Sequence, residues 1–217
     1  MEFVWYGQTC FRLSERGLNA VVTDPYPPEV GLTYPRSRAH VVTASYDDPA
    51  CRYVQGVRGP YSLFDGPGEY ETGGVFITGI HTYADDEEGS LRGLNTVFLF
   101  DFEGLTVCHL GYLGHVPAQS QVEDLGTVDV LLVPVGGGDS LAPAQASEVI
   151  SLFEPRIVIP MHYQIPGLKM QLGSLDRFRK EVGLESLKTE DTLKVSKANI
   201  SEETEIIVLL PKQREGE

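Results

Sequence analysis

The sequence predicts an α+β fold built as a four-layer αββα sandwich, with two β-sheets packed face to face and helices outside. Three observations support this prediction. Short segments rich in β-branched and aromatic residues dominate the first half of the 217 residues. Helical patterns are concentrated in the second half, where two continuous apolar runs indicate strands covered on both faces. One domain over residues 1–211 is the simplest organisation, with a frayed tail at 212–217.

The first half alternates short strands with turns. In this half, FDFEGLTV indicates a hairpin with Glu103 and Gly104 at its turn. The Pro-rich stretch 25–38 is expected to form a rigid rim loop, and DGPGEYE (65–71) a turn-rich loop. The predicted strands cover residues 2–6, 10–14, 19–23, 40–44, 61–64, 74–82, 95–101 and 105–109.

The second half is predicted to hold a βαβ unit. Strand 128–133 (VDVLLV), a helix over 143–152 and strand 156–160 (RIVIP) follow one another, and a right-handed crossover would place the helix on one face of the sheet. Further short helices are expected over 118–125 and 174–182. The Gly-rich VGGGDS (135–140) lacks the Lys of a phosphate-binding loop and reads as a tight strand-to-helix turn.

Composition excludes several classes of protein. A net charge of −14 and a pI near 4.7 argue against nucleic acid or an anionic membrane as partner, since both need a basic patch. Three cysteines are too few for a disulfide framework. No segment approaches the roughly 18 apolar residues of a membrane span, and MEFVWYG does not resemble a signal peptide. We expect a cytoplasmic protein with reduced thiols.

The stretch VVTASYDDPAC (41–51) is chemically ambiguous. A β-branched strand stops abruptly in a polar turn that carries Asp47, Asp48 and Cys51. Two carboxylates and a thiol at the end of a buried strand are possible metal ligands. They are equally compatible with an ordinary turn, because Asp often accepts hydrogen bonds from backbone N–H groups.

Seven blocks in order between Trp5 and Tyr163 resemble the metallo-β-lactamase superfamily. More narrowly, the chain is similar to small bacterial Zn-dependent hydrolases of this fold, relatives of the L-ascorbate-6-phosphate lactonase-like group. The resemblance implies a sandwich that holds one or two metal ions, which lower the pKa of a bound water to about 7. The blocks are WYGQTCF, VVTDPYPP, SYDDPAC, DGPGEYE, GLTVCHLGYLGH, VDVLLVPVGG and PRIVIPMHY.

The resemblance also shows which metal ligands this chain lacks. Relatives read close to SHDHPDH where this chain reads SYDDPAC. Tyr46 and Asp48 therefore stand at the first two His positions, Ala50 at the Asp position and Cys51 at the last His position. This alignment needs no insertion or deletion.

The remaining ligand positions lie in three later segments. The best alignment puts Ala84 where relatives carry a His, with His81 only three residues earlier and expected on the opposite strand face. Tyr112 replaces the Asp of a Gly-Asp pair, and only His162 matches the final metal His. Gln8 stands where relatives often carry another His.

Two interpretations of these positions remain open. The favoured one is a metal-free pocket in which Tyr46 and Tyr112 fill the space of the ions and no residue is catalytic. The alternative is a rebuilt site for one Zn at Asp48, Cys51 and His162, three donors of types that zinc accepts. His109 and His115 are expected to be hydrogen-bonded structural groups, with Asp139 and Ser140 beside the cleft.

The corresponding functional hypotheses come from different classes. The first is a catalytically inactive pseudo-hydrolase that binds a small ligand or a protein partner and uses no cofactor. The alternative is a metal-dependent hydrolase of a lactone, phosphoester or amide. A homo-oligomer, or pairing with an active paralogue, is a further possibility. Fold resemblance by itself does not decide among these activities.

Overall fold

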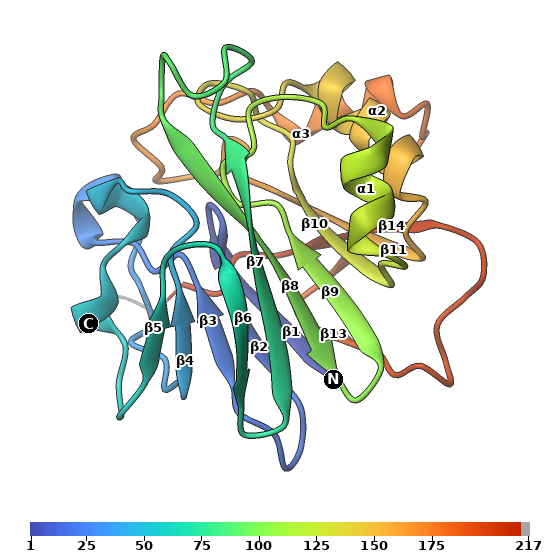
Figure 1. Cartoon of the computed structure of the whole chain (residues 1–217). Coiled ribbons are helices and arrows are strands. Elements are labelled where there is room, and N and C mark those ends of the chain that lie inside the picture. Colours follow the sequence, from blue (N-terminus) through green and yellow to red (C-terminus); the bar gives the residue numbers. More distant parts are fainter. Residues whose placement is uncertain (214–217) are drawn as a thin grey trace.

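A computed structural model describes residues 1–213 and shows two β-sheets packed against each other (Figure 1). The first sheet has the strand order β13-β1-β2-β3-β4-β5 and the second has the order β12-β14-β11-β10-β9-β8-β7-β6. The strands of the first sheet are β1 (Glu2–Gly7), β2 (Cys10–Ser14), β3 (Val21–Thr23), β4 (Val41–Thr43), β5 (Ser62–Phe64) and β13 (Leu193–Lys194). Those of the second are β6 (Gly68–Thr72), β7 (Val75–Tyr83), β8 (Leu94–Phe102), β9 (Leu105–His109), β10 (Val130–Pro134), β11 (Ile157–Met161), β12 (Lys188–Glu190) and β14 (Glu205–Leu209).

The two sheets share a core of aromatic and branched side chains. Side chains alternate between the faces of a strand, and the inward-facing ones of β1 and β2 meet those of β8 and β9. Trp5 stacks on Phe11 with ring centroids 6.3 Å apart, and Phe11 meets the ring of His109 edge-on, also at 6.3 Å. The predicted α+β fold with two packed sheets is therefore confirmed.

The helices are few and lie together beside the second sheet. They are α1 (Gln119–Leu125), α2 (Pro143–Phe153) and α3 (Leu175–Glu181), and α2 contacts both other helices and β10 (Figure 1). On the outer face of β1, Tyr6 instead packs edge-on against Tyr34 of the loop 25–38, at 5.8 Å. This loop is rich in proline, which interrupts α-helices, and contains one short 3-10 helix, η1 (Pro28–Val30), so an aromatic loop takes the place of an α-helical layer there.

Parallel strands bring several chain segments to one edge of the sandwich. Strands β3, β4 and β5 run parallel in the first sheet, and β9, β10, β11 and β14 run parallel in the second. The predicted βαβ unit is β10–α2–β11 and the predicted hairpin is β8–β9. Because the carboxyl ends of parallel strands meet at a common edge, the loops that follow them converge there.

The structure contains strands that sequence patterns did not predict. Edge strand β6 overlaps the second half of the expected loop DGPGEYE (65–71), where Gly68 and two exposed glutamates hide the strand pattern. Strands β12, β13 and β14 add to the sheets late in the chain. Lys212 and Gln213, expected in a frayed tail, bond instead to the carbonyls of Trp5 (2.8 Å) and Tyr6 (2.6 Å). The rest of that tail, 214–217, lies outside the described residues.

Among residues 1–213, every helix is too short or too polar to cross a membrane.

Candidate functional site

Loops that follow the strand ends build the candidate site. Tyr112 follows β9, His162 follows β11, and residues 45–51 follow β4. Asp24 (φ 42°), immediately after β3, and His162 (φ 52°) adopt left-handed backbone, which non-glycine residues rarely do and which often marks functional sites. The N–H of His162 donates to the carbonyl of Gln8, 3.1 Å away, and so joins the two sheets at this edge.

Three rings occupy the centre of the site. Tyr112 is 1% exposed and stacks on Tyr46 with ring centroids 5.2 Å apart. The ring of His162 meets Tyr112 edge-on at 4.8 Å. The hydroxyl of Tyr112 donates to Oε1 of Gln8 (3.3 Å), and that of Tyr46 donates to the carbonyl of Arg92 (2.6 Å). Two tyrosines and one histidine therefore lie packed together at positions where relatives are expected to carry ligands.

The loop after Tyr46 uses its polar groups to hold its own turn. Oδ1 of Asp48 accepts the N–H of Ala50 at 2.7 Å and caps a 3-10 turn over Pro49–Cys51. The thiol of Cys51 is buried and lies 3.3 Å from the carbonyl of Tyr46 and 3.4 Å from that of Asp48. Burial, together with the nearby charge of Asp24, raises the pKa of this thiol well above its ordinary value.

His162 is bound to an acid from the Gly-rich loop after β10. Its Nε2 lies 2.8 Å from Oδ1 of Asp139, and its ring is fully buried. Burial raises the pKa of Asp139, but the hydrogen bond and charge of His162 outweigh this and hold the pKa below its ordinary value. The expected position of Asp139 beside the cleft thus corresponds to direct contact with His162.

We expect Asp139→Ala to lower the free energy of unfolding by about 1–3 kcal/mol, because it leaves a buried imidazole without its partner. The lowered pKa of Asp139 means that its stabilising contribution is present above the unfolded value of 3.8 and is lost as the pH falls through the folded value. Urea unfolding at several pH values measures both effects. If neither Asp139→Ala nor His162→Ala changed the free energy of unfolding, the pair would contribute nothing to stability.

The segment after β7 is organised by a buried acid. The carboxylate of Asp85 accepts the backbone N–H groups of Glu87, Gly89, Leu91 and Arg92 at 2.6–3.1 Å. The acidic run 85–88 therefore begins with a buried carboxylate that shapes the loop.

Ala84 and His81 differ in their environment. Ala84 is fully buried, and its carbonyl accepts Nε of Arg92 at 2.7 Å. His81 is exposed on β7, with its ring 5.4 Å from that of Tyr83. His81 is therefore no replacement for the missing histidine at position 84.

A second buried acid, which the sequence did not reveal, lies beneath the rings. Asp24 accepts the N–H of Ser45 at 2.7 Å and its hydroxyl at 2.6 Å, and lies 3.9 Å from Nε2 of His109. Burial raises the pKa of Asp24, partly offset by His109 and Ser45. Burial also lowers the pKa of His109, whose Nε2 lies 2.8 Å from the carbonyl of Thr9. The only sequence sign of this acid was its place directly after strand VVT.

The donor set at this edge does not fit a zinc ion. Across residues 1–213, no group of three or more His, Cys, Asp or Glu side chains is placed to hold a metal. Of the three donors of the single-metal alternative, Asp48 caps a turn and the thiol of Cys51 faces carbonyls. His162 contacts Asp139 through Nε2 alone, and its buried Nδ1 has no hydrogen-bond partner among the described residues.

Two open clefts lie on the surface near the first sheet. A groove of 720 Å³ borders the loop after β4, with walls from Pro27, Val30, Asp48, Ala50 and Tyr53. Its volume is in the range of about 300–1,000 Å³ that is usual for small-molecule sites. The groove therefore offers room for a ligand directly beside Asp48 and Ala50, two positions where relatives are expected to carry metal ligands.

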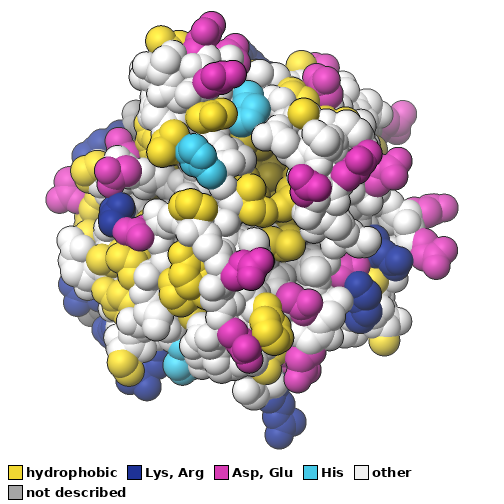
Figure 2. Space-filling model, in the orientation of Figure 1, with side chains coloured by type: hydrophobic (Ala, Val, Ile, Leu, Met, Phe, Trp, Pro, Cys, Tyr) yellow, Lys and Arg dark blue, Asp and Glu magenta, His cyan; other side chains and the backbone are white. Residues whose placement is uncertain are grey.

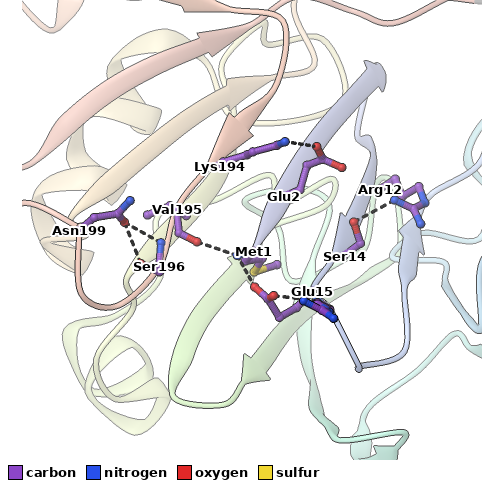
Figure 3. Close-up of a pocket in the computed structure, with 10 residues that line it drawn as sticks. Met1, Glu2, Arg12, Ser14, Glu15, Lys194, Val195, Ser196 and Asn199 are labelled. Atoms are coloured by element: carbon purple, nitrogen blue, oxygen red, sulfur yellow. Dashed lines mark hydrogen bonds and ion pairs between the residues drawn. The ribbon is translucent and has the colours of Figure 1, made fainter.

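The other cleft, shown in Figure 3, is lined mainly by charged and polar side chains. Lys194 pairs with Glu2 at 3.5 Å, Arg12 donates to Ser14 at 2.9 Å, and Glu15 pairs with the amino group of Met1. These groups satisfy one another across the cleft, so we place the candidate site at the strand ends instead.

The comparisons with known proteins agree with this architecture. Residues 2–162 match the family model described as "Beta-lactamase superfamily domain". A UPF0173 protein of Pyrococcus abyssi is 26% identical over 203 residues, which cover 84% of this chain and 90% of the relative. A UPF0173 metal-dependent hydrolase of Methanoculleus marisnigri is 25% identical over 198 residues, covering 82% and 88%.

Solved structures show the same similarity. A crystal structure from Thermotoga maritima, assigned to the Zn-dependent hydrolases of the metallo-β-lactamase superfamily, is 37% identical with a TM-score of 0.78. The match covers 96% of this chain and 97% of the Thermotoga maritima chain. Igni18 of Ignicoccus hospitalis, described as a metallo hydrolase, has a TM-score of 0.65 at 17% identity, covering 90% and 99%, and shares the fold.

Proposed function

This chain belongs to the family described as "Beta-lactamase superfamily domain", and from the packing of its own side chains we propose that its strand-end site binds a ligand without a metal ion. The protein would then be a pseudo-hydrolase that keeps the family's fold and has lost its catalytic chemistry. The observation that carries this proposal is the stack of Tyr46, Tyr112 and His162, which fills the centre of the site. The groove beside Asp48 and Ala50 is the proposed place for the ligand.

The chemistry of the side chains supports this reading at each position. Ala50 and Ala84 offer no side-chain donor, and a tyrosine with a raised pKa, as in Tyr46 and Tyr112, is a poor metal ligand at neutral pH. Asp48 and Cys51 already have hydrogen-bond partners within their own turn, whereas Nδ1 of His162 is buried without one among the described residues. A ligand in the groove would meet Tyr53, Pro27 and Val30 as apolar walls, with Asp48 at one side.

A second candidate is a metal-dependent hydrolase, and the comparisons favour it. The Methanoculleus marisnigri relative carries that name, and the Thermotoga maritima structure is assigned to Zn-dependent hydrolases. Nothing in these descriptions speaks of lost activity, so on the comparisons alone this reading is the better supported of the two. It requires that Asp48, Cys51 and His162 rearrange around one ion, and a lactone, phosphoester or amide would be the substrate class.

The decisive measurement is the metal content of the protein purified without chelator. For the metal-free site we expect far less than one equivalent of zinc and a melting temperature that EDTA leaves unchanged. Zinc held at 100 times its dissociation constant would stabilise the fold by about 2.7 kcal/mol, so a bound ion would show as a clear loss of melting temperature in EDTA.

Matched cysteine variants separate the two candidates. If the protein held one equivalent of zinc that Cys51→Ala lost and Cys108→Ala kept, the single-metal site would be established and the metal-free proposal would be wrong. Cys108 is a suitable control because it is equally buried but lies within β9, away from the loop after β4.

A further inference from the structure

A small apolar pocket lies on the outer face of the second sheet, between β7, β8 and α1. Its volume is 240 Å³, and its apolar walls are Ile80, Val97, Leu110, Leu113, Leu125 and Phe153. Figure 2 shows hydrophobic side chains gathered in a recess on this face, with acidic side chains to its right and below and histidine side chains above and to its left.

This pocket is separate from the strand-end site. Ile80 of β7 lies opposite Val97 of β8, and the two face outward because the neighbouring residue Phe98 points into the sandwich. The pocket therefore opens on the side of the sheet that the helices flank, whereas the three stacked rings lie at the strand ends. A ligand bound here would touch neither Tyr46 nor His162.

The volume limits the size of an occupant. An apolar cavity of about 150 Å³ is enough for benzene. The pocket, at 240 Å³, fits a single ring with a short arm or a short alkyl chain. Its walls contribute methyl and phenyl groups, so the buried part of the occupant must be apolar.

The rim of the pocket favours a positive charge. Asp124 and Gln121, both exposed on α1, supply its polar edge, and none of the described residues that line it is basic. The last turn of α1 carries Glu123 and Asp124 and no basic residue, so two acids lie at the end of the helix that prefers cations. A cationic group beside Asp124 would relieve this unfavourable arrangement.

We propose that this pocket binds a small hydrophobic amine, with its ring or alkyl chain among the apolar walls and its ammonium group at Asp124. No part of this proposal depends on metal binding or on the strand-end site. The net charge of −14 adds a general attraction for cations, and the pocket adds the selectivity for an apolar body.

Ligand-observed NMR with 2-phenylethylamine tests the proposal, with phenylacetate as the matched anion and 2-phenylethanol as the matched neutral probe. We expect the amine to bind most tightly and the carboxylate most weakly. Asp124→Asn should weaken the amine about threefold, the effect of one exposed ion pair, and leave the alcohol unchanged. Glu123→Gln removes a charge from the same helical turn but not from the pocket, and should have a smaller effect.

A second variant tests the location of the site. Thr78→Trp places a large ring at the half-buried edge of the pocket and should reduce binding of the amine more than tenfold, with the melting temperature as the check on folding. Equal binding of amine and carboxylate, or equal effects of Asp124→Asn and Glu123→Gln, would overturn the assignment of a cation site. Undiminished binding to the Thr78→Trp variant, or no binding of any probe, would overturn the pocket itself.

Discussion

Tyr112→Ala is expected to lower the free energy of unfolding by about 3–5 kcal/mol, the range for removing a large aromatic side chain from a core. Tyr112 is among the largest fully buried side chains of the protein. Its removal would take away the ring contacts of both Tyr46 and His162 and leave a cavity at the centre of the site. Urea unfolding followed by far-UV circular dichroism gives the value.

Tyr112→Phe is the matched control for this prediction. It keeps the ring and loses only the 3.3 Å hydrogen bond to Gln8, so a loss of about 1 kcal/mol is expected. If Tyr112→Ala proved nearly as stable as the wild-type protein, the ring would not be filling a packed core. That result would contradict the filled pocket and would favour the alternative in which the site rearranges to bind a metal ion.

The second large effect is expected for Asp24→Ala, with a loss of about 2–5 kcal/mol. The substitution removes the acceptor of two buried donors, the N–H and the hydroxyl of Ser45, and each unsatisfied donor costs about 1–3 kcal/mol. Alanine also tolerates the left-handed backbone at this position less well than Asp does. Chemical denaturation near neutral pH measures the loss.

Asp24→Asn serves as control and gives a pH test. Because burial raises the folded pKa of Asp24 above the unfolded value of 3.8, its contribution to stability is greatest below pH 3.8 and is lost as the pH rises through the folded pKa. Relative to Asp24→Asn, the wild-type protein should therefore lose stability from pH 3 to pH 8. The difference between the two proteins cancels the titration of all other carboxylates, and a difference that grew in the opposite direction would refute the raised pKa.

Local patterns predicted most of the architecture. Strands with clear β-branched runs, such as β4 and β10, and the hairpin turn at Glu103 and Gly104 follow from short-range preferences. Edge strand β6 was not predicted, because its glutamates and glycine are typical of a loop. The loop cover of the first sheet depends on how Tyr6, Tyr26 and Tyr34 pack, which no local pattern encodes.

The candidate site also combines local features, which the sequence predicts, with long-range contacts, which it does not. Asp48 capping its own turn is a local property that the Asp-Pro sequence predicts. The roles of Asp24 and Arg92 depend on partners far along the chain, 21 residues for Asp24 with Ser45 and 46 for Arg92 with Tyr46. Sequence spacing carries no signal for contacts of that range. The pairing of His162 with Asp139 likewise depends on the parallel pairing of β10 with β11, which brings the loops after these two strands together.

The left-handed residues at the strand ends separate the backbone of this edge from its side-chain chemistry. His162 and Asp24 hold their turns through main-chain bonds, to the carbonyl of Gln8 (3.1 Å) and to that of Thr43 (2.8 Å). Neither bond involves a side chain that a metal would need. Substitutions in the loop 46–51 therefore leave both bonds, and the turns that they hold, in place. The side-chain chemistry of that loop can change without a change in how the strand ends are joined.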